Sequence, residues 1–296
     1  MNKISTAGPP KLSVVVASQN ARQCIDGCLR AIESQNVNGN VEIVVVDNST
    51  DETADIIRSE FPAVKLVAAD KDKLIPELWG IGIGQCRGDY VSLTTSHFVP
   101  TKNWIAEIIK AHEQPHAGIG GAIENARHAG IVSWAVYFCR YSPYMLPFIE
   151  TEVEDFAADN ASYKRRDLEQ VKDAMRDGFW ETFVHREMRR EGMSLLKSPE
   201  IVVYHQKSFT LAGFMKQRFW HGLQFGSNRR MTPARRALMI ALSPSIPFLY
   251  LFRISRRVFA KRRNIDKFLL SLPLLMLFLL SWSAGEFSGY LRISSK

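Results

Sequence analysis

The sequence has few cysteines and no group of them at metal-binding spacing. Its 296 residues contain four, which are Cys24, Cys28, Cys86 and Cys139. The first two are three residues apart, without the second pair that would complete a zinc site. A small disulfide-stapled fold is excluded, and we expect reduced thiols. The opening MNKISTAGPP has no apolar run, so we expect no secretory signal there.

A glycine-rich phosphate loop is also missing. The first apolar run, LSVVVASQ at 12–19, is followed by NARQ, which contains no glycine. Dinucleotide-binding folds need glycine at that turn, because only glycine lets the backbone approach a pyrophosphate closely. The GIGIG at 80–84 lies in a helical pattern and follows no strand. A dinucleotide-binding fold is therefore disfavoured, and so is a nucleotidyltransferase, which would want an early glycine-rich and basic phosphate loop.

Buried strands alternate with helical patterns in the first part of the chain. Hydrophobic residues make up 46% of the sequence and charged residues 23%, the composition of a core-forming protein. Alternation of this kind predicts an α/β fold with a doubly wound, mostly parallel sheet, Rossmann-like in layout. The four predicted strands are 12–19, 41–47, 63–69 and 89–94.

Ligands of such sheets bind at the carboxyl ends of the strands. We therefore expect the functional site to include polar residues at those ends. They are Ser18–Asn20, Asp47–Ser49, Asp70 and Thr94–His97.

Positive charge is concentrated in the last quarter of the chain. The net charge is +8, yet the first 228 residues carry a slight excess of acids. Between Arg229 and Lys267 there are eleven arginines and lysines, Arg230 included, against Asp266 alone. Such a segment binds either nucleic acid or an anionic membrane face. Nucleic-acid binding is disfavoured, because aromatic residues are not interleaved with the basic ones and long aliphatic runs are present instead.

Two uncharged apolar segments lie within and after this basic region, at 237–252 and 268–284. Each is shorter than the ~20 residues that span a bilayer. The first contains Pro244 and Pro247 and has arginines on both sides, which favours a bent, re-entrant or interfacial hairpin. The second spans, tilts or lies beside the first, and two core helices of a soluble domain are the alternative. We expect a catalytic domain at 1–228 and a membrane-associated helical tail at 229–296.

The combination VEIVVVDNSTDET, GDYVSLTTSHFVP and GFWETFVHREMRREG resembles family-two glycosyltransferases of the A-type fold over about residues 10–228. The resemblance implies a membrane-associated, inverting enzyme. Its partners would be a nucleotide-diphosphate sugar and a lipid-linked or cell-envelope glycan acceptor. It would act at the cytoplasmic face of a membrane, for example a bacterial inner membrane. A catalytically inactive membrane scaffold with the same fold is the alternative from another class.

The resemblance also implies roles for individual residues. Asp47 would hold the nucleobase or ribose, and Glu181, counted back from the Arg189-x-x-Gly192 turn, falls on the catalytic base. Asp155 is the main competitor for that role. We further expect Trp180, Phe183, Val184 and Met188 to form a buried helical stripe. The remaining donor-binding candidates are Ser18, Asn20, Ser49, Thr95, Ser96 and Arg218.

The metal-binding aspartates of that family are absent here. Aligned on GDY, they fall on Thr95 and His97, and a further histidine ligand falls on His205. Two histidines and the phosphate oxygens of the substrate would hold a divalent cation, Mn²⁺ or Mg²⁺. The alternative is transfer without metal, in which Arg218, His221 and Lys207 offset the charge of the leaving group.

Overall fold

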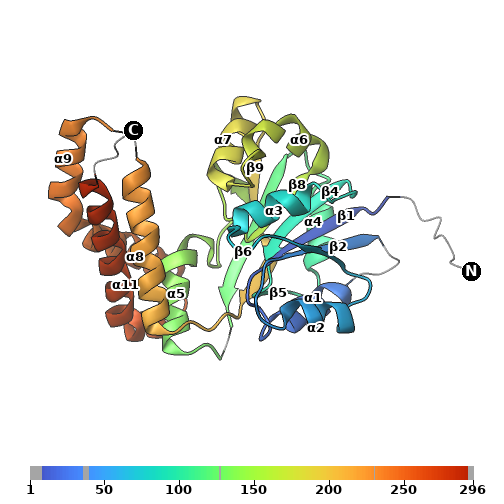
Figure 1. The fold of residues 1–296 in the computed structure, drawn as a ribbon, viewed down its shortest axis with the longest axis horizontal. Helices are drawn as coiled ribbons and strands as arrows, with labels where there is room; N and C mark the ends of the chain where they lie inside the picture. Colours follow the sequence, from blue (N-terminus) through green and yellow to red (C-terminus); the bar gives the residue numbers. More distant parts are fainter. Residues whose placement is uncertain (1–8, 36–39, 127, 230, 293–296) are drawn as a thin grey trace, which may run out of the picture. The chain divides into compact units, whose positions relative to one another are not determined.

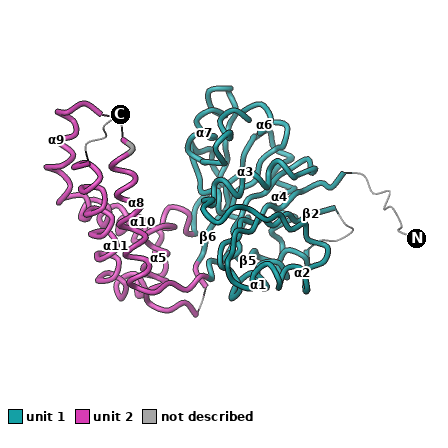
Figure 2. The backbone as a smooth tube through the Cα atoms, viewed as in Figure 1, with its two compact units in different colours: residues 1–124, 146–206 teal, residues 125–145, 207–296 magenta. Residues whose placement is uncertain are grey.

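The computed structural model describes residues 9–35, 40–126, 128–229 and 231–292. Residues 1–8 and Arg230, which enter the expectations above, lie outside these ranges. The chain forms two compact units (Figure 2). Unit 1 comprises 1–124 and 146–206, and unit 2 comprises 125–145 and 207–296. The limits of the compact units do not coincide with residue 228. The division into a catalytic domain at 1–228 and a membrane-associated tail at 229–296 stays a prediction.

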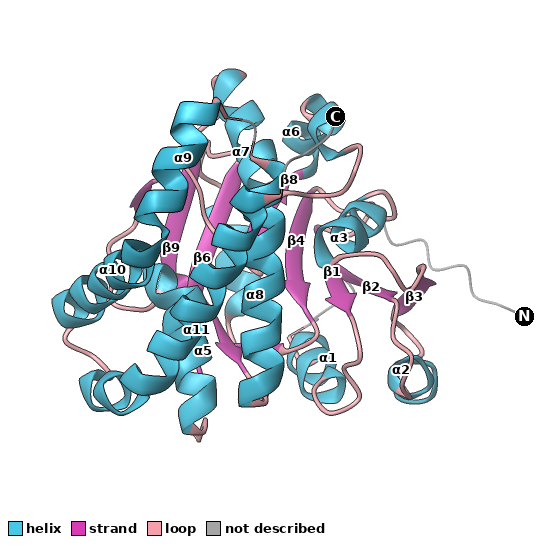
Figure 3. Cartoon of the chain, turned by 60° about the vertical axis from the view of Figure 1, so that its left-hand side comes forward, coloured by secondary structure: helices cyan, strands magenta, loops and turns pink. Residues whose placement is uncertain are grey.

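Unit 1 is built on one nine-stranded sheet with the order β3-β2-β1-β4-β8-β6-β9-β5, in which β7 pairs with β9 (Figures 1 and 3). The first four strands are parallel, as the alternating pattern predicts. All seven residues of the first strand are buried, so both faces of the sheet are covered there. The parallel strands are β1 (Leu12–Ser18), β2 (Val41–Asp47), β3 (Lys65–Ala68) and β4 (Tyr90–Thr95).

The second half of the sheet is mixed. β8 pairs antiparallel with β4, so that Asn160 lies opposite Thr94. β6 and β5 also make antiparallel pairs, with β8 and β9 respectively. The sheet is therefore an α/β sheet of the predicted class with an antiparallel insertion. Its later strands are β5 (Phe98–Pro100), β6 (Gly118–Asn125), β7 (Thr151–Glu152), β8 (Asn160–Lys164) and β9 (Leu195–His205).

Helices of unit 1 form where apolar residues recur at helical spacing. In the first of them, Cys28, Leu29 and Ile32 are buried against the sheet. In the third, Gly82 allows close contact, because a Cβ there would overlap Val15 of β1. These helices are α1 (Ile25–Glu33), α2 (Thr53–Glu60), α3 (Ile75–Ile83), α4 (Trp104–Ala111), α6 (Arg165–Gln170) and α7 (Glu181–Arg190).

Unit 2 is helical and collects segments from two parts of the sequence. The aromatic stretch after β6 forms a helix whose Phe138 ring meets Phe268, 5.3 Å between centroids. That stretch packs with the C-terminal helices and belongs to their core. The helices are α5 (Ile131–Tyr141), α8 (Leu211–Asn228), α9 (Pro233–Leu242), α10 (Ile246–Lys261) and α11 (Ile265–Leu291).

Glycines join α8 to α11. Gly222 and Gly226 face α11, whereas Gly285 and Gly289 face α8. A Cβ at any of the four would overlap backbone atoms of the other helix, so the two backbones are in direct contact. Glycines four residues apart on both helices are the pattern that brings helices close in an apolar environment. The longest helix of the chain is thereby fixed to the one that precedes the basic region.

The second apolar segment lies in one long helix, α11, of 27 residues, whereas the first is divided between α9 and α10. The stretches Pro233–Lys261 and Ile265–Leu291 are long and apolar enough, by length and composition, to cross a membrane. In the most apolar part of the stretch Pro233–Lys261, only 17% of the residues are buried within the protein. The helices of a soluble core are mostly buried, so this stretch is not an ordinary core segment. The predicted bend is present, since a 3-10 turn at Ser243–Ser245 separates α9 from α10.

Candidate functional site

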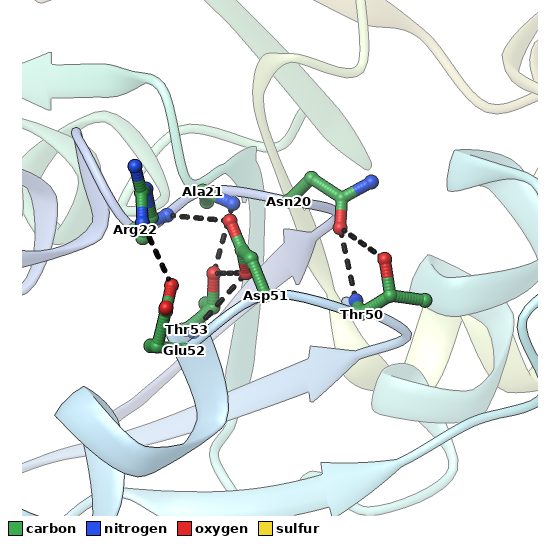
Figure 4. A network of polar contacts seen from close by, with 7 residues as sticks. All are labelled: Asn20, Ala21, Arg22, Thr50, Asp51, Glu52 and Thr53. Atoms are coloured by element: carbon green, nitrogen blue, oxygen red, sulfur yellow. Dashed lines mark hydrogen bonds and ion pairs between the residues drawn. The ribbon is translucent and has the colours of Figure 1, made fainter.

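The loops after β1 and β2 are bound to each other by side-chain hydrogen bonds (Figure 4). The backbone N of Asn20 donates to Ser49 Oγ at 2.8 Å, and Asn20 Oδ1 accepts from the backbone N of Thr50 at 2.9 Å. Asn20 adopts a positive φ of 49°, which asparagine tolerates better than most residues. Asp51 accepts hydrogen bonds from Thr53 and from the backbone N of Arg22. Two of the predicted donor residues are therefore brought together.

Asp47 ends β2 with its side chain turned toward Ser49. Ser49 Oγ donates to Asp47 Oδ1 at 2.6 Å, and the Ser49 N donates to Oδ2 at 3.2 Å. The carboxylate is thus held in one orientation while each of its oxygens keeps a further lone pair. Ser18, at the end of the neighbouring β1, is fully buried, and its Oγ makes no hydrogen bond within the described residues.

A chain of contacts runs from this corner to the start of α3. Asn48 Nδ2 donates to the carbonyl of Lys73 at 2.8 Å. Lys73 pairs with Glu77 at 2.9 Å, and Glu77 also accepts from the backbone N of Leu74, capping α3. On the same helix, Trp79 Nε1 donates to the Thr94 carbonyl at 2.8 Å. α3 therefore links the end of β2 to the end of β4.

The turn after β4 brings the predicted metal residues together. Thr95 Oγ1 lies 3.1 Å from His97 Nδ1, and the backbone N of Ser96 donates to the Ala17 carbonyl of β1. The His97 carbonyl accepts from Gln206 N at 2.9 Å, which ties the turn to the end of β9. His205 is buried there, and its ring meets His97 edge to face with centroids 5.3 Å apart.

This donor set does not suit Mg²⁺. Among the described residues there is no group of three or more His, Cys, Asp or Glu that could hold a metal, and Mg²⁺ prefers oxygen ligands in octahedral geometry. Imidazole nitrogen is a better ligand for transition metals than for Mg²⁺. Two imidazoles bound at about 2.1 Å to one ion place their ring centres roughly 5 Å apart. His97 and His205 meet that spacing, and substrate oxygens would have to supply the other ligands.

Glu181 begins α7, and this start lies against α3. The backbone N of Phe179 donates to the Pro76 carbonyl at 2.7 Å, and Gly178, with φ of 108°, packs on Glu77. Since α3 also contacts the ends of β2 and β4, the predicted base and the predicted donor residues belong to one connected part of unit 1. Glu181 itself is half-buried.

The predicted apolar stripe of α7 is partly wrong. Val184 and Met188 are buried, but Trp180 is 37% exposed and Phe183 is 53% exposed. The third buried position is His185. Because histidine is polar, the spacing of hydrophobic residues does not predict that this position is buried. The buried stripe is therefore shifted by one residue, and Trp180 and Phe183 are left on the surface.

Asp155 and His185 make a contact that the sequence pattern did not reveal. His185 Nδ1 lies 2.5 Å from Asp155 Oδ1, and His185 Nε2 lies 2.7 Å from the hydroxyl of Tyr163 on β8. Thr182 Oγ1 donates to Asp155 Oδ2 at 3.1 Å. The competitor for the base is therefore attached to the same first turn of α7 that carries Glu181.

Arg218 lies on α8 in unit 2. Its guanidinium stacks over the Trp282 ring at 4.2 Å, and burial lowers the pKa of Arg218 from its usual value. Lys207, also in unit 2, lies over the ring of Phe209 at 5.6 Å. The role of Arg218 at the donor phosphates stays a prediction.

The chain matches the model of a known family. The family described as Glycosyl transferase family 2 matches residues 13–172, more than half of the chain. This range contains β1 to β4, the turn with His97, and Asp155, and it ends before Glu181. No curated protein sequence matches the chain.

Several solved structures share the fold. A mannosyltransferase, PcManGT from Pyrobaculum calidifontis in complex with GDP-Man and Mn²⁺, has a TM-score of 0.54 at 16% identity, covering 94% of this chain and 87% of that one. Residues 1–349 of S. aureus TarS in complex with UDP-GlcNAc have a TM-score of 0.50 at 13% identity, covering 92% and 81%. At these identities the likeness concerns the fold.

Proposed function

The chain belongs to glycosyl transferase family 2, and from this premise we propose that it transfers a sugar from a nucleotide-diphosphate sugar, with inversion, to a lipid-linked or cell-envelope glycan acceptor. The observation that carries the proposal is the network of contacts in unit 1. It joins the end of β2 at Asn48, the end of β4 at Thr94 and the start of α7 through α3 and the loop before it. An inverting transfer needs these groups in one place, because donor and acceptor must react in a single displacement.

The donor binds, in this proposal, along the ends of β1, β2 and β4. Asp47 accepts hydrogen bonds from an imide N–H of the base or from ribose hydroxyls, and Ser49 fixes the orientation of the carboxylate. Ser18, Asn20, Thr95 and Ser96 line the same edge and supply hydroxyl, amide and backbone groups. The nucleotide sugars in the two similar structures, GDP-Man and UDP-GlcNAc, support a donor of this class.

Glu181 acts as the general base. Its carboxylate takes the proton of the acceptor hydroxyl as that oxygen attacks the anomeric carbon, while the nucleoside diphosphate leaves from the opposite face. The position at the first turn of α7 suits the role, since a half-buried carboxylate there is open to an approaching acceptor. Trp180, which directly precedes it and is exposed, offers apolar surface to a sugar ring.

The diphosphate is neutralised at the turn after β4. His97 and His205 would hold Mn²⁺, which supplies positive charge to the departing phosphate when bound. Without metal, Arg218 and the other cations of its segment would offset that charge. The Mn²⁺ in the PcManGT complex supports the first alternative.

Unit 2 would anchor the enzyme at a membrane. Its apolar stretches carry exposed Phe248, Phe252 and Phe259, and the arginines around them suit anionic headgroups. The basic side marks the cytoplasmic face, where nucleotide sugars are made, as in a bacterial inner membrane. An acceptor held in or on that membrane is consistent with such an anchor.

The proposal is tested with purified full-length protein and a panel of nucleotide sugars, with Mn²⁺, with Mg²⁺ and with a chelator. Hydrolysis or transfer of one donor, lost in Asp47→Ala and in Glu181→Gln, is the expected result. An inactive scaffold would bind a donor without turning it over under any of these conditions. Release of pyrophosphate from a nucleoside triphosphate would instead indicate a nucleotidyltransferase.

A further inference from the structure

His185 connects a surface carboxylate to a buried phenol. The histidine is fully buried on α7, and Tyr163 of β8 is fully buried as well, whereas the side chain of Asp155 is 43% exposed. The two ring nitrogens contact the two partners at 2.5 and 2.7 Å. Phe156 packs against the imidazole at 4.4 Å between ring centroids and closes the space around it.

The contacts fix the direction of each hydrogen bond. A carboxylate only accepts, so His185 Nδ1 carries the proton that it donates to Asp155 Oδ1. In the neutral ring Nε2 is then an acceptor, and the Tyr163 hydroxyl donates to it. Phe156 N and Thr182 Oγ1 add one further hydrogen bond to each carboxylate oxygen. Asp155 is thus held from three sides, with its outer face toward solvent.

We propose that His185 is a positioning residue for the acceptor: backed by Tyr163, it holds the Asp155 carboxylate at the first turn of α7, where that carboxylate accepts a hydrogen bond from a second hydroxyl of the acceptor while Glu181 receives the attacking one. This inference rests on the proposed function. It names the acceptor class as a polyhydroxyl group such as a sugar ring. A phosphate acceptor would be repelled by the carboxylates of Asp155 and Glu181, because all three groups are negatively charged.

The location of Asp155 supports an acceptor role over a donor role. Thr182, which donates to Asp155, directly follows Glu181 in the chain. The donor candidates at the ends of β1 and β2 instead form hydrogen bonds with each other and with the loop before α3. A charged hydrogen bond to a preset carboxylate orients a substrate without losing side-chain entropy on binding.

The experiment compares two replacements of His185. His185→Leu removes the N–H that faces Asp155, whereas His185→Asn keeps an N–H at nearly the position of Nδ1. We expect about a tenfold higher KM for a sugar acceptor in His185→Leu, with donor Kd unchanged, and recovery of most of the loss in His185→Asn. Tyr163→Phe keeps the ring volume and should raise the acceptor KM by a few-fold, since it removes only the contact to Nε2.

A double-mutant cycle isolates the coupling. If His185 acts through Asp155, His185→Leu adds nothing to the acceptor KM in an Asp155→Ala background. Additive effects on KM would overturn the proposal, and so would equal acceptor KM values in His185→Leu and His185→Asn.

His112 supplies the matched control. It is also a buried histidine bonded to a hydroxyl on β8, with Nε2 2.9 Å from Ser162 Oγ, and burial lowers its pKa to about 3. It stacks on Tyr90 beside a cavity of about 610 Å³ at the start of β4, away from α7. His112→Asn should lower the Tm and leave the acceptor KM unchanged. A KM change equal to that of His185→Leu would mean that loss of any buried histidine perturbs the site, which refutes a specific role.

Different results would refute the proposed function and the positioning role of His185. If the wild-type protein neither binds nor turns over any nucleotide sugar, the proposed function falls and this inference falls with it. If the wild-type protein transfers sugar but His185→Leu raises donor Kd and acceptor KM alike, only the positioning role is refuted. Efficient transfer to a polyisoprenyl phosphate, with no transfer to sugars, would refute the acceptor class alone.

Discussion

The rings of His97 and His205 meet edge to face, 5.3 Å apart, where the family resemblance implies carboxylates and a histidine around a metal. Imidazole nitrogen binds transition metals better than it binds Mg²⁺, which prefers oxygen ligands. We expect Mn²⁺ to strengthen binding of the nucleotide sugar and Mg²⁺ to have little effect. His205→Ala should reduce, about tenfold, the gain in nucleotide-sugar affinity that Mn²⁺ provides. Titration calorimetry with and without the metal measures this gain.

A variant that should accept Mg²⁺ provides the converse test of metal preference. The double variant Thr95→Asp, His97→Asp restores two carboxylates at the turn, and we expect Mg²⁺ then to support donor binding. Identical donor affinity of the wild-type protein with Mn²⁺ and with a chelator would contradict metal use and favour the cationic alternative.

Glu181→Gln should abolish transfer while donor binding stays intact. The amide keeps the size of the side chain but cannot take the proton of the attacking hydroxyl, a contribution of about 10²–10⁴-fold in rate. Single-turnover assays with the preferred donor measure the rate, and calorimetry measures donor Kd. Glu187→Gln, on the outer part of the same helix, is the control and should keep full activity. A fully active Glu181→Gln would refute the base assignment.

The Asp51 network predicts a pH-dependent stability. Burial raises the pKa of Asp51, but hydrogen bonds from Thr53 and from the backbone of Arg22 outweigh it, so the pKa is lowered overall. A lowered folded-state pKa stabilises the fold above the unfolded pKa of about 4, and the contribution disappears as the pH falls through the folded value. Asp51→Asn should lower the Tm at about pH 6, and the difference from wild type should shrink as the pH falls below about 4. A constant difference across that range would contradict the interpretation.

The close contact of α8 and α11 at their glycines predicts that these positions do not tolerate a larger side chain. Gly222→Leu or Gly285→Leu forces a side chain into the backbone of the facing helix, and overpacking of this kind costs about 1–3 kcal/mol. We expect faster proteolysis of residues 207–292 in detergent. Gly130→Leu, at a position where an added Cβ would meet nothing within 4 Å, should leave the digestion pattern unchanged. Equal resistance of all three variants would show that helix contact does not stabilise unit 2.

The arginines of α10 should contribute to membrane affinity. Each cation near an anionic surface contributes about 1 kcal/mol, so the triple change to serine at 253, 256 and 257 should weaken vesicle binding roughly 100-fold. Sedimentation with vesicles of neutral and anionic lipid, at low and high salt, measures the effect. A control triple at Arg58, Arg176 and Arg190 of unit 1 should bind like wild type. Binding independent of lipid charge would argue against headgroup recognition.

The parts of the fold that local pattern determines were predictable. β1 and β2 are continuous apolar runs, and the structure confirms both strands and their parallel pairing. β6 and β8 were not predicted, because GIGGAIEN and NASYK lack a strand pattern. Gly120 and Gly121 are required there by Phe156 and by the backbone of Ile201, contacts that only the folded chain creates.

Some residues of the candidate site could be predicted from the sequence, and others could not. Strand ends could be read from the sequence, so Asp47 and His97 were identified as candidates without coordinates. His185 was not, because a polar residue on an apolar helix face carries no signal in a hydrophobic period. Its partners Asp155 and Tyr163 are 30 and 22 residues away in the chain, so only tertiary contact relates the three.

The order in which the chain visits the two units limits how the protein can be shortened. It leaves unit 1 after residue 124, returns at 146 and leaves again after 206. A truncation at 206 or 228 would therefore keep α5 yet delete α11, and the Phe138 ring would lose Phe268. Soluble versions made by cutting the C-terminus would expose an aromatic helix and aggregate, whereas replacing 125–145 with a short linker as well would remove that liability.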